Sequence, residues 1–97
     1  MKQLTILCSE EIRDKVIHAM NSAELQGYAE VGNVTGNRPK DKRYIDIRAM
    51  TWPATMFIAL AEDEKVRQII ESLKEYPELC EIQPCLRVIV TEVVEYC

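Results

Sequence analysis

The sequence predicts a single α+β domain whose elements follow the order strand, helix, strand, strand, helix, strand. The chain has 97 residues, enough for one core, and its 47% hydrophobic and 29% charged composition is typical of a packed globular domain. Two stretches repeat apolar residues at helical spacing, and four shorter stretches are rich in apolar or β-branched residues. One domain spanning residues 1–97 is therefore expected.

The first half of the chain predicts a strand, a helix and a second strand. Residues 3–8 are apolar, and Ser9-Glu10-Glu11 after them is typical of a helix start. Gly27 is expected in the left-handed conformation just past the helix end, residues 28–34 form the next strand, and the polar residues 35–43 form a loop. The predicted apolar stripe of the helix is Ile12, Val16, Ala19, Met20 and Ala23.

The second half predicts a hairpin arm, a buried strand, a helix and a last strand. Residues 44–50 alternate between polar and apolar side chains, and Trp52-Pro53 is expected to interrupt the extended chain. The apolar run 55–61 predicts a buried strand, and the helix that follows is expected to stop before Pro77. Residues 85–94 are β-branched and predict the final strand.

This order is the ferredoxin-like arrangement βαββαβ, in which two helices pack on one face of a four-stranded antiparallel sheet. Three of the predicted strands carry large apolar side chains on both of their faces, as in Leu4 and Ile6 against Leu7, or Met56 and Ile58 against Phe57. Two helices can cover only one of those faces. An uncovered apolar sheet face is unusual on a monomer, so we expect self-association through the sheet.

Charge and composition exclude several classes of function. Sixteen acidic and twelve basic side chains leave a net charge of -4, so no nucleic acid partner is expected. The apolar runs are far shorter than the roughly 20 residues that cross a bilayer, so no direct membrane insertion is expected, and we place the protein in the cytoplasm. His18 is the only histidine, and no nucleophile stands beside an obvious base, so we expect no enzyme and no catalytic residues.

The four cysteines do not form a recognisable metal motif. Cys80 and Cys85 are separated by four residues, unlike the CxxC spacing of structural zinc sites, so no metal site is expected. In the cytoplasm we expect Cys80 and Cys85 to be separate thiols rather than a disulfide, and Cys8 to be a packing residue.

Three segments resemble the P-II signal proteins and their P-II-like relatives. Gln26-Gly27-Tyr28-Ala29-Glu30-Val31-Gly32-Asn33-Val34-Thr35-Gly36 is similar to the family's second strand and the glycine at the base of its T-loop. Residues 57–66 resemble the third strand and the acidic start of the second helix, and residues 90–94 resemble the Val-rich final strand. The resemblance covers nearly the whole chain.

The resemblance implies a homotrimeric regulatory protein with its sheets facing inward. Its clefts between subunits would bind a nucleotide or a small anionic metabolite, with an adenine nucleotide as the implied ligand and no certain cofactor. A T-loop-like segment at about 37–54 would act on a partner protein, such as a membrane transporter or an enzyme. The implied ligand-binding residues are Gly36, Asn37, Arg38, Lys40 and Arg48, and the implied partner-binding residues are Lys42, Arg43 and Trp52.

The chain also departs from the family. Residues 74–84 contain no glycine and three glutamates, where P-II proteins have a glycine- and lysine-rich loop that grips phosphates. The family's basic residues near the end of the last strand are replaced by Glu92, Glu95 and Tyr96. Two alternatives therefore stay open: a metal-responsive trimer resembling the CutA proteins, and an ACT-like amino-acid-sensing module.

Overall fold

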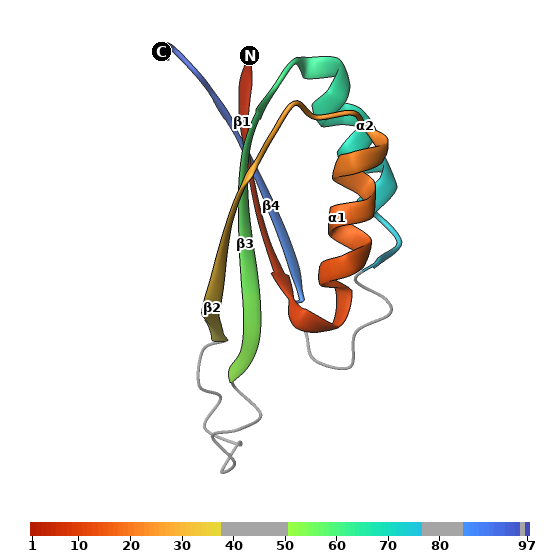
Figure 1. Ribbon diagram of the computed structural model, residues 1–97, viewed down its shortest axis with the longest axis vertical. Coiled ribbons are helices and arrows are strands. Elements are labelled where there is room, and N and C mark those ends of the chain that lie inside the picture. Colours follow the sequence, from red (N-terminus) through yellow and green to blue (C-terminus); the bar gives the residue numbers. More distant parts are fainter. Residues whose placement is uncertain (38–50, 77–84, 96) are drawn as a thin grey trace.

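The computed structural model describes residues 1–37, 51–76, 85–95 and 97. Its strands lie in the order β2-β3-β1-β4 with every neighbouring pair antiparallel, and both helices cover one face of the sheet (Figure 1). This is the predicted ferredoxin-like arrangement. The elements are β1 (Lys2–Ser9), a 3₁₀ turn η1 (Glu10–Ile12), α1 (Arg13–Ser22), β2 (Ala29–Asn37), β3 (Thr51–Ala61), α2 (Asp63–Leu73) and β4 (Leu86–Glu92).

The core lies between the two helices and the sheet. Leu4 and Ile6 of β1 face Ala59 and Phe57 of β3 in the strand register, and all four are buried. The predicted stripe of α1 is buried as expected, and α2 contributes its own apolar face because its buried residues recur at helical spacing. The core residues of η1, α1, the C-cap of α1 and α2 are Ile12, Val16, Ala19, Met20, Ala23, Val66, Ile69 and Leu73.

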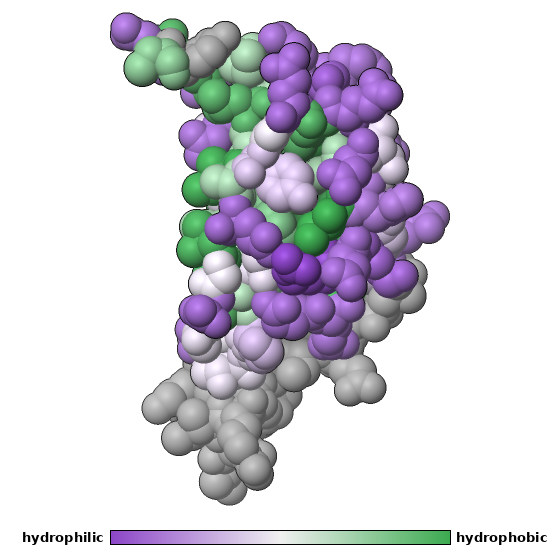
Figure 2. All heavy atoms as spheres, viewed as in Figure 1, coloured by the Kyte–Doolittle hydropathy of each residue, from purple (hydrophilic) through white to green (hydrophobic). Residues whose placement is uncertain are grey.

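The opposite side of the sheet carries no helix, and we call it the open face. Strand register places its side chains in rows: Val31, Met56, Leu7 and Arg87 form one row, and Ala29, Ile58, Thr5 and Ile89 form the next. Leu60 and Ile89 remain 42% and 57% exposed, so this face is both apolar and accessible. Figure 2 shows apolar side chains along the sheet margin and mostly hydrophilic side chains over the helices.

The chain leaves α1 differently from the prediction. The left-handed residue after the helix is Glu24, with φ 57°, and Gly27 does not have a positive φ. The reason is that α1 ends at Ser22, so Glu24 stands at the position just past the cap, where a left-handed residue stops a helix. No helix in the part of the chain that the structure describes is long and apolar enough to span a membrane.

The hairpin is longer than predicted. Residues 35–37 belong to β2 rather than to a loop, and Trp52-Pro53 lies inside β3 instead of interrupting it. Proline is tolerated there because the pairing of β3 with β1 ends at Ala54 opposite Ser9, so beyond that point β3 has only β2 beside it. The hairpin arm predicted at residues 44–50 lies outside the described residues.

Candidate functional site

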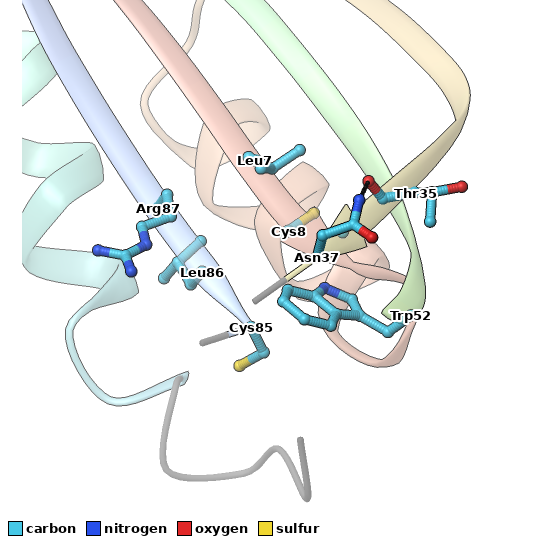
Figure 3. Close-up of a pocket in the computed structure, with 9 residues that line it drawn as sticks. Leu7, Cys8, Thr35, Asn37, Trp52, Cys85, Leu86 and Arg87 are labelled. Atoms are coloured by element: carbon cyan, nitrogen blue, oxygen red, sulfur yellow. Dashed lines mark hydrogen bonds between the residues drawn. The ribbon is translucent and has the colours of Figure 1, made fainter. Parts of the chain in front are cut away.

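A cavity of about 270 Å³ opens at the end of the sheet where β2 and β3 extend beyond β1. Leu7 and Cys8 of β1, Leu86 and Arg87 of β4, and the paired ends of β2 and β3 surround it (Figure 3). Its other lining residues are Thr35, Gly36, Asn37, Trp52 and Cys85. Two of the lining residues, Leu7 and Arg87, also belong to the open face. The cavity is therefore continuous with the uncovered side of the sheet.

The lining combines an apolar surface with few polar groups. Leu7 and the Trp52 indole supply the apolar part, and Arg87 is the only cationic lining residue in the described part of the chain. The Asn37 side chain donates a 3.2 Å hydrogen bond from Nδ2 to the carbonyl oxygen of Thr35, which ties it to its own strand. An apolar pocket with a charge at its edge suits a ligand that has a flat apolar part and an anionic part.

β1 and β4 meet firmly beside the cavity. The Ser9 amide donates a 2.8 Å hydrogen bond to the carbonyl oxygen of Cys85, one step past the last paired residues, Cys8 and Leu86. Cys85 is itself disulfide-bonded, which corrects the expectation that it is a separate thiol. Cys80 lies outside the described residues. The start of β4, which borders the cavity, is thus held in place by its pairing with β1.

Cys8 also borders the cavity, but its thiol is expected to be unreactive at neutral pH. It is buried, and burial, followed by the negative charge of Glu10, raises the pKa of the Cys8 thiol from 9.0 to about 11. Glu10 accepts a 2.6 Å hydrogen bond from the Thr55 hydroxyl. A thiol that keeps its proton at neutral pH is neither a good nucleophile nor a good metal ligand. Cys8 is thus a packing residue, as the sequence indicated.

The structure brings together three of the residues predicted to bind a ligand or a partner. Gly36 and Asn37 lie at the end of β2 and line the cavity, and Trp52 lines it from β3. Trp52 is only 7% exposed, so its ring lies mostly inside the protein. The predicted T-loop-like segment at about 37–54 begins and ends within these two strands. The remaining predicted residues, Arg38, Lys40, Lys42, Arg43 and Arg48, lie outside the described residues.

Arg87 and Leu7 were not identified from the sequence. Sequence reasoning looked for positive charge in the long basic loop, whereas the register of β4 places a single arginine at the cavity. One signal was present: Arg87 is the only charged residue between Cys85 and Thr91, and it interrupts an otherwise apolar strand. The structure shows that this residue is exposed and lines the cavity, so the single charge in the apolar strand was the available signal.

Metal chemistry receives no support from the described ranges 1–37, 51–76 and 85–95. Within them, no group of three or more histidine, cysteine, aspartate or glutamate side chains is placed to hold a metal ion. Of the cysteines that border the cavity, Cys8 holds its proton and Cys85 is in a disulfide.

Comparison with known proteins finds relatives only among solved structures, since no family model and no curated protein matches the chain. The apo form of CPII, a nitrogen regulatory PII-like protein from Thiomonas intermedia K12, is 21% identical with a TM-score of 0.70, covering 95% of this chain and 87% of that one. CPII bound to ADP, AMP and bicarbonate is 20% identical with a TM-score of 0.67, covering 99% and 94%.

A PII-like signaling protein from Thermus thermophilus is also similar, at 17% identity and a TM-score of 0.61, covering 95% of this chain and 85% of that one. These matches extend over almost the full length of both chains. The chain therefore has the fold of the PII-like proteins.

Proposed function

We propose that this chain is a PII-like regulatory protein that binds an adenine nucleotide, or another small anionic metabolite, in clefts between the subunits of a cytoplasmic homotrimer. The ligand state would be passed to a partner protein through the segment at about 37–54. This is a binding function rather than catalysis. The structure of CPII with ADP and AMP supports the ligand class, because that protein has the same fold.

One observation carries the proposal: the cavity opens onto the uncovered, apolar face of the sheet. Its volume of about 270 Å³ is slightly below the roughly 300 to 1,000 Å³ typical of small-molecule sites. Leu7 and Arg87 belong both to the cavity and to the open face. A second subunit seated on that face would therefore add the missing wall of the cavity, as an intersubunit cleft requires.

Arg87 is the residue we assign to the anionic part of the ligand. Arg87 is an exposed residue that lines the cavity, and its guanidinium offers a planar set of donors suited to phosphate. The start of β4 positions it, and Leu7, its neighbour in the sheet, keeps apolar surface beside the charge. Arg87 would thereby supply charge that the glutamate-rich residues 74–84 do not.

Calorimetric titration with ADP, AMP and ATP tests the proposal, with sedimentation measured on the same samples. Arg87→Gln should weaken the nucleotide that binds best by about 1.5 to 3 kcal/mol, the range for a hydrogen bond to a charged group, or roughly 10- to 150-fold in Kd. Arg67→Gln is the matched control. Arg67 is an exposed arginine of α2 that is paired with Glu64 and does not line the cavity, so this substitution removes the same charge at another place.

Equal effects of the two substitutions would show that Arg87 acts only through net charge. Absence of binding by all three nucleotides would contradict the nucleotide proposal itself. A metal titration of the reduced protein in parallel separates this function from that of a metal-responsive trimer.

A further inference from the structure

We infer that Trp52 is an aromatic wall of the cavity, held in place by Gly36, and that it selects anions that carry a planar ring over anions that lack one. This inference rests on the proposed function and adds the specificity of its site. It concerns the single tryptophan of the chain and the glycine directly opposite it in the β2–β3 pair.

The Trp52 ring lies directly on Gly36. A Cβ atom built on Gly36 would be 2.7 Å from Cζ2 of Trp52 and still closer to Cε2 and Nε1. Side chains directly opposite each other in an antiparallel pair are neighbours on one face of the sheet, so the indole folds over its cross-strand partner. Any larger residue at position 36 would force the indole to move.

Gly36 is required for space and not for backbone conformation. No glycine in the described ranges has a positive φ, so an alanine at position 36 would meet no backbone strain of the left-handed kind. Gly32 lies in the same strand, and a Cβ built there meets nothing within 4 Å. Gly32 lies in the irregular part of the pairing between Val31 and Val34, but it has no side chain above it, so the indole is what makes an added Cβ costly at Gly36 and not at Gly32.

An aromatic side chain within a sheet can pack over a glycine for structural reasons alone. That role does not explain why the Trp52 ring also borders a cavity. Trp52 also lines the cavity, reaching it from β3, with Leu7 of β1 among the other lining residues (Figure 3). Stacking on an aromatic side chain favours any base, since every base has a flat π face. Arg87 lines the same cavity and supplies the charge for the anionic group.

The geometry also gives a direct readout. Trp52 is the only tryptophan, so the tryptophan fluorescence of the protein reports on this cavity alone. ADP stacked on the indole should quench and shift that emission, whereas pyrophosphate, which has the charge but no ring, should leave it unchanged even when it binds. Fluorescence therefore distinguishes contact with the ring from contact with the charge.

The test measures ADP and pyrophosphate binding to four variants. Trp52→Leu should weaken ADP by roughly 5- to 150-fold, the range for loss of one base stack, and leave pyrophosphate affinity unchanged. Trp52→Phe keeps a ring and should recover most of the ADP affinity. Gly36→Ala should behave like Trp52→Leu because it displaces the indole, while the matched control Gly32→Ala should bind like the unaltered protein.

Two results overturn the inference while leaving the proposed function in place: an ADP affinity that Trp52→Leu does not change, or equal losses for ADP and pyrophosphate in that variant. The second would mean that Trp52 acts only by packing the end of the hairpin. If the unaltered protein binds no ADP, the proposed function fails and this inference fails with it. Circular dichroism checks that each variant folds; if Trp52→Leu does not fold, Gly36→Ala gives the same test, because it displaces the indole without removing it, and an unchanged ADP affinity in that variant would overturn the inference.

Discussion

Ile89 offers a quantitative test of association through the open face. It lies opposite Thr5, which pairs in turn with Ile58, so it belongs to the central row of that face. Its side chain is 57% exposed in the single chain. Complete burial of an isoleucine contributes about 1.5 to 3 kcal/mol, so burying the exposed part should contribute roughly 1 to 1.5 kcal/mol per subunit. Three subunits give about 3 to 5 kcal/mol per trimer.

Replacing Ile89 with lysine should therefore do more than weaken the assembly. The substitution removes that apolar contribution and places an ammonium group where three copies would meet without partners, which is costly in a desolvated interface. We expect Ile89→Lys to be monomeric at micromolar concentrations. Ile89→Ala, which loses only apolar area, should raise the trimer dissociation constant by roughly two powers of ten or more.

Sedimentation velocity over a concentration series measures these effects, with circular dichroism to confirm that each variant folds. Val94→Lys is the matched control, because Val94 is 99% exposed and lies past the end of β4. If Ile89→Lys sediments like the unaltered protein, the open face is not the interface. A monomeric unaltered protein would remove the intersubunit cleft altogether.

Two further predictions concern the core. Phe57 is fully buried and meets the Tyr28 ring edge-on at 5.7 Å, so Phe57→Ala should lower the free energy of unfolding by about 3 to 5 kcal/mol in denaturant titration, and a loss under about 1 kcal/mol would place Phe57 outside the core. Cys8 keeps its proton up to a pKa of about 11 in the folded chain against 9.0 as its ordinary value, so its contribution to stability is complete below pH 9 and is lost as pH rises toward 11. The difference in free energy of unfolding between the unaltered protein and Cys8→Ala should therefore shrink over that pH range. Alkylation at about pH 8 should modify the exposed Cys97 well before Cys8. Equally fast modification of both cysteines would contradict the raised pKa of Cys8.

The fold could be predicted because its signals are local and agree with one another. The stripe that includes Val16 and Met20 has the period of a helix buried on one side, and it is buried in the structure. The ends of elements were less predictable. Pro53 argues against a strand in sequence, yet it lies in β3 because the sheet has only one neighbour at that point, and that depends on where β1 stops.

The candidate site was only partly predictable because it is made by register. Gly36 and Asn37 were predicted because residues 26–36 resemble the second strand of the P-II proteins and the glycine at the base of their T-loop, which is a local match along the chain. Arg87 is 50 residues beyond Asn37 in the sequence, and only the pairing of β4 with β1 brings it to the same cavity. No periodicity within β4 reveals which strand will lie beside it.

The pairing of Leu7 with Arg87 joins the two unusual features of this molecule. Leu7 continues the apolar row toward Met56, and Arg87 ends the row with a charge at the edge of the cavity. In an isolated chain, both the apolar row and the open cavity would face water, so the apolar side chains of the row would contribute no free energy of burial. A second copy on the open face would cover the row and wall the cavity in one step, so ligand binding and association would be two consequences of one surface.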